Sequence, residues 1–276
     1  VENKIEVPEK ELVQFYRHLG DPVTFDKEYM TDDYINTYSK GYRELVPVRN
    51  KDISGYGDPG LFSGGDDGEV KWHSESQNRD THEDVVCFSM KTMSSTGGDT
   101  WFMDQKVMYD NLIKLFPELD DYDVDWTNRY SHEKPDNDLP YNSWKKWDEK
   151  CIKGGDGWMF MRMKDIDGEY LVNKEVKFKP LVTENTITGQ RGLMYPHQTV
   201  YSLKPKSDFL LQVLEDECEK EEYIYQHHWK IGDVVINDIQ HSLHRRDVYT
   251  GDRLIYRTAL YFPENSNDPR KKHLHQ

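Results

Sequence analysis

A strand-rich block near the C-terminal end of the chain organises the rest of the sequence. Residues 229–262 read WKIGDVVINDIQHSLHRRDVYTGDRLIYRTALYF. A Gly-Asp turn leads into a short β-branched run, a polar stretch with two histidines follows, and a second strand begins at Arg253. Because side chains alternate between the faces of a strand, Arg253, Ile255, Arg257 and Ala259 share one side. Two arginines are therefore expected on one face.

These two arginines require an anionic partner. Both faces of the predicted strand carry apolar residues, so we expect the strand to be covered on both sides. An unpaired guanidinium in such a place costs several kcal/mol. A carboxylate of the protein could supply the negative charge, and so could the carboxylate of a small molecule. The segment WHSE at residues 72–75 favours the small molecule.

The composition indicates an acidic, soluble protein without a nucleic-acid or membrane partner. We expect one domain over residues 1–276, which is enough chain for one large core. The formal net charge of −15 argues against nucleic acid and anionic membranes, which bind clustered Lys and Arg. No run approaches membrane-spanning length. Three cysteines without a framework spacing favour an intracellular, cytoplasmic location. The oligomeric state is left open.

Short strands with few helices are predicted along the chain. Helices are expected at 9–19, from Asp104 to about 116, and after Ser207, where Asp104 and Ser207 are N-caps. Strands are expected at 44–48, 84–90, 100–103, 158–161, 170–172, 177–182, 192–195, 234–236 and 253–260. Residues 55–68 are interpreted as a glycine-rich loop and 118–157 as an irregular insertion. The pattern favours an α+β, mainly β fold, a double-stranded β-helix (jelly roll) decorated by helices.

His73 and Glu75 are the first candidate metal ligands. They are two residues apart, so on an extended segment both side chains point the same way. Together with a distant second imidazole they would make the 2-His-1-carboxylate triad of non-heme Fe(II) oxygenases. The pair alone is a weak signal, because the chain contains 11 histidines.

Four ordered motifs make the sequence resemble the taurine dioxygenase family of Fe(II)- and 2-oxoglutarate-dependent oxygenases. They are WHSE at 72–75, STGGDT at 95–100, KPLV at 179–182 with TG at 188–189, and NDIQHSLHR at 237–245 followed by Arg253 and Arg257. The resemblance extends over most of the chain.

The resemblance implies that His73, Glu75 and His244 bind the iron. His244 is preferred to His241 because the family places its histidine six residues after an aspartate, here Asp238, and an arginine follows directly. The remaining candidates, His197, His227, His228 and His241, are interpreted as structural or surface histidines. A glutamate at residue 75 argues against a halogenase, which would have a small residue there.

The resemblance also implies how the cosubstrate binds. Thr100 and Arg253 would hold the distal carboxylate of 2-oxoglutarate, the arginine as a fork and the threonine as a hydroxyl donor. Arg257 would face the substrate or support the cosubstrate. Its contact with the substrate would suit an acidic group, whereas an internal salt bridge is an equally good reading of the same residue.

An oxygenase of this kind would abstract hydrogen from an unactivated C–H bond of a small carboxylate metabolite, using O2 and releasing succinate and CO2. Hydroxylation, desaturation and oxidative cyclisation are the expected outcomes, and the kainoid-forming cyclases of specialised metabolism belong to this wider group. A Zn-dependent hydrolase is one alternative, since two His and one Glu also suit zinc, but it leaves Thr100 and the paired arginines unexplained. The other is a non-catalytic ligand-binding jelly roll.

Overall fold

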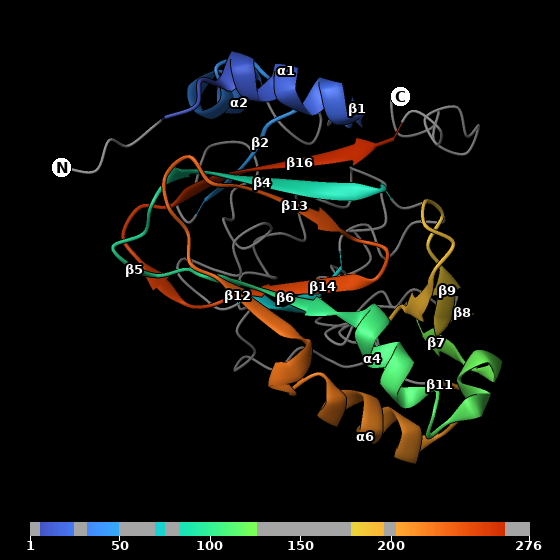
Figure 1. The fold of residues 1–276 in the computed structure, drawn as a ribbon. Helices are drawn as coiled ribbons and strands as arrows, with labels where there is room; N and C mark the ends of the chain where they lie inside the picture. Colours follow the sequence, from blue (N-terminus) through green and yellow to red (C-terminus); the bar gives the residue numbers. More distant parts are fainter. Residues whose placement is uncertain are drawn as a thin grey trace, which may run out of the picture.

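Two antiparallel sheets face each other at the centre of the molecule (Figure 1). The computed structural model describes residues 6–24, 32–49, 70–74, 83–125, 178–195 and 203–262. The first sheet consists, in spatial order, of β1 (Asp21–Pro22), β16 (Leu254–Tyr261), β4 (Val85–Thr92) and β13 (Val234–Asp238), and β2 (Val46–Arg49) also pairs with β16. The second sheet has the order β12 (Ile224–His227), β6 (Thr100–Asp104), β14 (Ser242–Arg246) and β3 (Val70–His73).

The inner faces of the two sheets share one hydrophobic cluster. Phe88 from β4, Phe102 from β6, and Ile255 and Ala259 from β16 all belong to it. Tyr256 and Leu260 alternate with the latter pair and pack in a separate cluster on the outer side. The predicted alternation of the last strand is therefore confirmed from Ile255 onward, and side chains on the Ile255 side of β16 point between the sheets.

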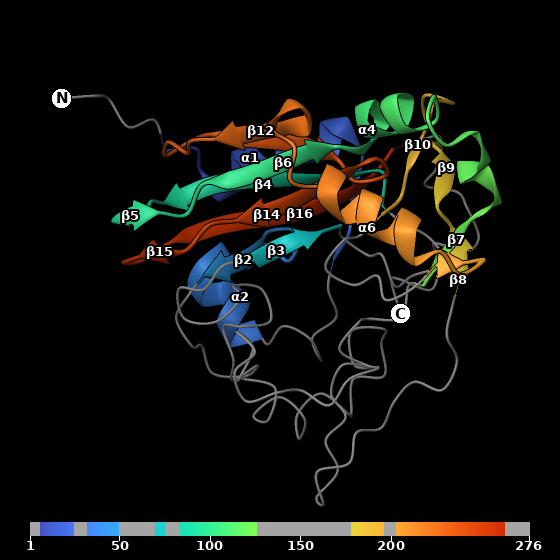
Figure 2. The ribbon, with the colours of Figure 1, turned by 90° about the horizontal axis from the view of Figure 1, so that it is seen from below.

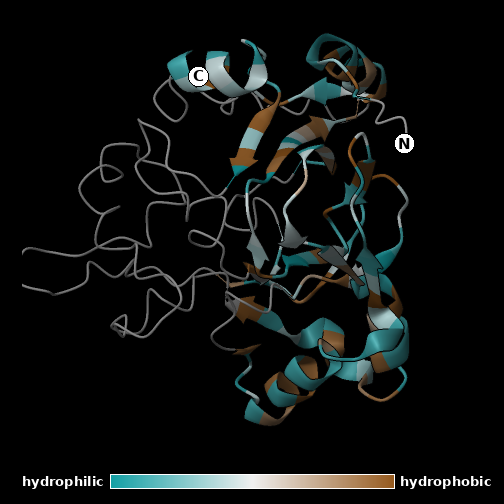
Figure 3. Cartoon of the chain, turned by 90° about the vertical axis from the view of Figure 1, so that its left-hand side faces the viewer, coloured by the Kyte–Doolittle hydropathy of each residue, from teal (hydrophilic) through white to brown (hydrophobic). Residues whose placement is uncertain are grey.

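Helices cover the outer faces. The helix α1 (Glu9–Leu19) and α2 (Asp32–Ser39) lie on the side of the first sheet, whereas α4 (Gln105–Leu112) and α6 (Asp208–Glu217) lie on the side of the second (Figures 1 and 3). Both predicted N-caps are confirmed, because the side chains of Asp104 and Ser207 accept backbone hydrogen bonds from the first helical turn. No helix among the described residues combines the length and apolarity needed to cross a bilayer.

Smaller pairings lie at the two ends of the sheets (Figure 2). At one end β5 (Thr96–Gly97) pairs with β15 (Tyr249–Thr250). At the other end lie β7 (Asp123–Asp125), β8 (Phe178–Pro180), β9 (Val182–Glu184), β10 (Arg191–Leu193) and β11 (Leu203–Lys204), with the 3-10 turn η1 (Pro117–Asp121). A second 3-10 turn, η4 (Glu221–Tyr223), precedes β12.

Several local predictions need correction. The polar stretch with the two histidines was not predicted to be a strand, but Ser242–Arg246 forms β14, because β6 and β3 pair with it on both sides. The helix from Asp104 ends at Leu112 rather than near 116, and α2 and β12 were not predicted. The supposed irregular insertion at 118–157 begins with η1 and the paired strand β7.

Other expectations lie outside the described residues. These are the glycine-rich loop at 55–68, the strands at 158–161 and 170–172, and the greater part of the region 118–157. Of the three cysteines, Cys87 and Cys218 are buried and free. The mainly β class with few helices is confirmed, and the single domain stays a prediction.

Candidate active site

Two histidines lie side by side on neighbouring strands of the second sheet. The antiparallel pairing of β3 and β14 places His73 directly opposite His244, and their ring centroids are 4.2 Å apart. The ring of His244 is 6% exposed and packs edge-on against Phe88 of the other sheet, at a centroid distance of 5.2 Å. The pair therefore lies at the inner side of the second sheet.

This pair suits one divalent metal ion. With metal–nitrogen distances of about 2.1 Å, two imidazoles bound at right angles have ring centroids about 4.6 Å apart, which is close to the observed 4.2 Å. Glu75, the expected carboxylate ligand, lies outside the described residues. Among the residues that are described, no third His, Cys, Asp or Glu joins the pair. Two imidazoles and a carboxylate carried two residues after His73 form a donor set that fits Fe(II).

The rival histidine, His241, has a structural position. Its Nε2 lies 3.1 Å from the hydroxyl of Thr183 on β9, and its ring is 5% exposed. Burial lowers the pKa of His241, although Asp238 acts in the opposite direction. A Cβ at Gly192 on β10 would lie 2.6 Å from the ring of His241. His241 thus anchors the hairpin of β9 and β10.

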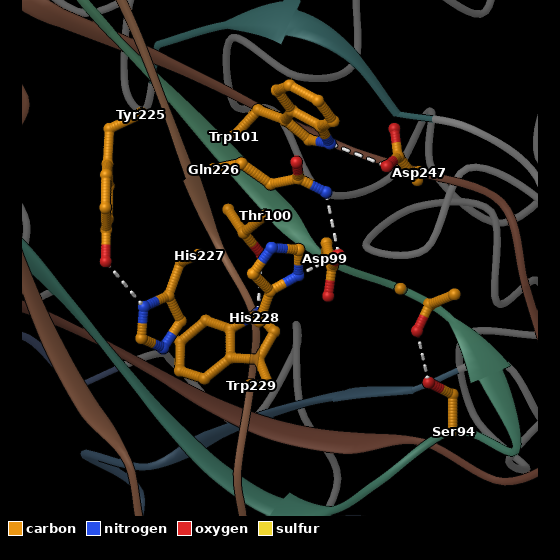
Figure 4. A network of polar contacts seen from close by, with 12 residues as sticks. Ser94, Asp99, Thr100, Trp101, Tyr225, Gln226, His227, His228, Trp229 and Asp247 are labelled. Atoms are coloured by element: carbon orange, nitrogen blue, oxygen red, sulfur yellow. Dashed lines mark hydrogen bonds and ion pairs between the residues drawn. The ribbon is translucent and has the colours of Figure 1, made fainter.

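Two other candidates within the described part of the chain, His227 and His228, also lie apart from the pair. His227 contacts the carboxylate of Asp233 at 3.1 Å, and His228, whose side chain is 74% exposed, contacts Asp99 at 2.7 Å. Both lie within the polar network of Figure 4. His197 lies outside the described residues.

Arg253 is a buried cation, and the attraction that it receives from negatively charged groups is weak. It is 3% exposed, and its Nη2 donates a hydrogen bond of 3.2 Å to the carbonyl of Gly98. Its Nε has no hydrogen-bond partner among the described residues. Burial, followed by repulsion from Arg246, lowers the pKa of Arg253 to about 9, and the attraction of Asp99 is weaker. An anionic ligand would stabilise this guanidinium, so the residue fits the distal carboxylate of 2-oxoglutarate.

Thr100 is poised to donate a hydrogen bond. Its hydroxyl accepts one of 2.9 Å from the indole Nε1 of Trp229 (Figure 4). Because an indole N–H can only donate, the hydroxyl of Thr100 keeps its own proton available for an acceptor. Thr100 is 5% exposed at the start of β6. A carboxylate beside it would receive this proton, in agreement with the expected role.

The glycines of the STGGDT motif permit this arrangement. Gly97 and Gly98 have φ values of +64° and +81°, which favour glycine. A Cβ at Gly98 would lie 3.2 Å from the Nε of Arg253 and 3.2 Å from the Cβ of Tyr249. The next residue, Asp99, accepts from Gln226 at 2.8 Å (Figure 4). The turn therefore allows Arg253 to contact Gly98, two residues before Thr100.

Arg257 shares the inner face, as the alternation predicted. It is 5% exposed and lies opposite Phe88 in the pairing of β16 with β4. Arg253 precedes the first residue of β16, and the pairing with β4 is irregular between Leu254 and Ile255. The two arginines consequently come from a strand and from the loop before it.

Sequence reasoning missed three residues beside Thr100 and Arg253. They are Trp229, Tyr249 and Arg246, which are 5%, 1% and 6% exposed. Arg246 follows His244 by two residues, so reading 242–246 as a strand would have placed both on one face. Trp229 and Tyr249 carry no comparable local signal, because their contacts with the site depend on pairing between distant strands.

A family model agrees with this geometry. The model described as "Taurine catabolism dioxygenase TauD, TfdA family" matches residues 2–259. The chain belongs to this family. Members of the TauD/TfdA family are 2-oxoglutarate-dependent non-heme iron oxygenases, which use Fe(II) and 2-oxoglutarate.

A curated relative agrees with this membership. The (S)-phenoxypropionate/alpha-ketoglutarate-dioxygenase of Sphingobium herbicidovorans is 28% identical over 185 residues, which are 64% of this chain and 56% of that protein. The chain thus spans little more than half the length of this relative.

Solved structures show the same fold. A taurine dioxygenase from Burkholderia xenovorans has a TM-score of 0.59 and 16% identity, over 95% of this chain and 78% of its own. The structure of AAD-2 in complex with Mn(II) and N-oxalylglycine has a TM-score of 0.55 and 20% identity, over 80% of this chain and 75% of its own.

Proposed function

We propose that the protein is an Fe(II)- and 2-oxoglutarate-dependent dioxygenase that oxidises an unactivated C–H bond of a small acidic metabolite. The observation that carries this proposal is the position of His73 and His244 opposite each other on the strands β3 and β14, on the inner side of a sheet. The buried Arg253 and the hydroxyl of Thr100 complete the set. We also propose that the two facing sheets form a jelly-roll core.

His73 and His244, with Glu75, would hold the iron. When bound, the iron and 2-oxoglutarate supply the oxidation, in which O2-dependent decarboxylation to succinate and CO2 is coupled to removal of hydrogen from the substrate. The protein positions the reactants. Arg253 and Thr100 would bind the distal carboxylate of the cosubstrate and so fix its orientation.

The aromatic side chains around His244 would keep water away from the site. Phe88 from the first sheet and Phe102 from the second pack near its ring, at centroid distances of 5.2 and 6.3 Å. They belong to the cluster that fills the space between the sheets. Exclusion of water protects a reactive oxidising centre from side reactions.

The buried position of Arg257 supports the proposal that the substrate is acidic. Arg257 is buried on the inner face of β16, opposite Phe88. Taurine and phenoxypropionate, which appear in the names of the relatives, carry a sulfonate and a carboxylate. We therefore propose a carboxylate or sulfonate substrate that is hydroxylated, desaturated or cyclised, and oxidative cyclisation of the kainoid type is one of these product classes.

Succinate formation tests the proposal. The protein loaded with Fe(II) should convert 2-oxoglutarate to succinate in the presence of O2, slowly even without the substrate. The same protein loaded with Zn(II) should form none, because zinc has no redox chemistry. Arg253→Gln should raise the KM for 2-oxoglutarate about tenfold or more, through loss of a charge-assisted contact. Succinate formation no faster than with free Fe(II) would contradict the proposal and leave a binding protein or a hydrolase.

A further inference from the structure

The second arginine after His244 lies beside the same site as Arg253. Antiparallel pairing of β14 with β6 places Arg246 opposite Thr100, just as it places His244 opposite Phe102. Residues two apart on a strand share a face, so Arg246 and His244 both point between the sheets. Along the strand the two are roughly 7 Å apart, which is about the reach of a five-carbon chain.

A tyrosine ring joins Arg246 to Arg253. The guanidinium carbon of Arg246 lies 4.7 Å from the ring centroid of Tyr249, and that of Arg253 lies 5.5 Å from the same centroid. Tyr249 is 1% exposed, and both arginines are at most 6% exposed. Two buried guanidinium groups therefore contact one buried aromatic ring, which brings them close to each other.

The positive charges of these two arginines repel each other in the ligand-free protein. Repulsion by Arg246 is the second-largest cause, after burial, of the lowered pKa of Arg253. Asp99 attracts Arg253 but contributes less than Arg246 repels. One carboxylate placed between the two cations would reduce the repulsion, and each guanidinium can offer it paired donors.

We propose that Arg246 is a second guanidinium that binds the distal carboxylate of 2-oxoglutarate, together with Arg253 and Thr100. This proposal rests on the proposed oxygenase function. It assigns to Arg246 a direct role in selecting a cosubstrate with a second carboxylate over a 2-oxo acid that has only one. The neighbouring arginine, Arg245, has no such role.

Arg245 provides a matched control because it lies on the opposite face of β14. Its guanidinium carbon is 5.0 Å from the ring of Trp72 and 4.7 Å from that of Trp101. Both tryptophans belong to, or pack against, the hydrophobic cluster on the outer side of the second sheet. Substituting Arg245 removes the same charge from the same strand without touching the inner face.

The test compares two ligands on protein loaded with Mn(II), by isothermal titration calorimetry. 2-Oxoglutarate and 2-oxopentanoate have the same 2-oxo acid end, and only the first has a distal carboxylate. The ratio of their Kd values isolates the contribution of that carboxylate from any damage to the metal site or the fold. Arg246→Gln should weaken 2-oxoglutarate binding about tenfold or more and leave 2-oxopentanoate unchanged.

Two further variants complete the test. Arg246→Lys keeps the charge but loses the forked pair of donors, so its ratio of Kd values should lie between those of the parent and Arg246→Gln. If Arg246→Gln fails to fold, Arg246→Lys takes its place in the comparison. Arg245→Gln should keep the parent ratio. An unchanged ratio in both Arg246 variants would overturn the proposal while 2-oxoglutarate still binds the parent. Absence of Mn(II)-dependent binding of 2-oxoglutarate by the parent would instead contradict the oxygenase function itself.

Discussion

Single side chains decide what this site can bind. Thr100 and Arg253 were predicted from sequence because both belong to short motifs, and burial of a guanidinium after an apolar strand demands an anion. The direction of the Thr100 hydroxyl could not be predicted. It depends on Trp229, which follows β12 and reaches Thr100 only because β12 pairs with β6. Local sequence carries no information about that pairing.

Replacing Thr100 tests its role as a hydrogen-bond donor. Thr100→Val keeps the shape of the side chain but removes the hydroxyl, so the Kd for 2-oxoglutarate on the Mn(II)-loaded protein should rise about tenfold. The variant should also lose about 1 to 3 kcal/mol of stability, because the buried N–H of Trp229 loses its acceptor. Thr100→Ser should bind nearly as well as the parent. Equal Kd values for the valine variant and the parent would remove Thr100 from the binding site.

At the level of elements, β14 shows where sequence patterns mislead. Residues 242–246 belong to a stretch that was described only as polar from the sequence, yet they form a central strand of the second sheet. Leu243 packs in the outer cluster, and His244 points between the sheets. A strand that carries functional polar residues on its inner face lacks the usual hydrophobic alternation, so the sequence pattern does not predict it as a strand. The helices α4 and α6, whose caps are local signals, were predicted at their starts.

The hairpin of β9 and β10 gives a prediction about stability. Gly192→Ala would push a Cβ into the ring of His241, so we expect a loss of about 1 to 3 kcal/mol, measured by chemical denaturation. Combining Gly192→Ala with His241→Ala removes the clash. The double variant should therefore lose less free energy of unfolding than the sum of the losses in the two single variants. Simple additivity would mean that the two residues do not touch.

Across the whole molecule, the candidate site joins the two sheets. His244 comes from the second sheet, while Phe88 and Arg257 come from the first. The order of the four motifs predicted the family, and the family model bears this out. The pattern of short strands with few helices predicted the mainly β class, which the structure confirms. The pairing of β3 with β14 could not be predicted from pattern alone, because it joins strands from distant parts of the chain.

Ligand binding should therefore stabilise the complete fold. Mn(II) with N-oxalylglycine, at about 100 times the Kd, should raise the free energy of unfolding by about 2.7 kcal/mol through preferential binding to the native state. The rise in melting temperature should be clearly smaller for Arg253→Gln at the same concentrations. A melting temperature that does not respond to the two ligands together would show that the sheets enclose no such site.

The central claim is that His73 and His244, and not His241, bind the iron that 2-oxoglutarate chelates. An anaerobic titration with Fe(II) and 2-oxoglutarate tests it, monitored by the weak visible charge-transfer band of the chelate. The band should form in the parent protein and in His241→Ala and should be lost in His244→Ala. A band of equal intensity in His244→Ala and the parent would show that the iron binds elsewhere.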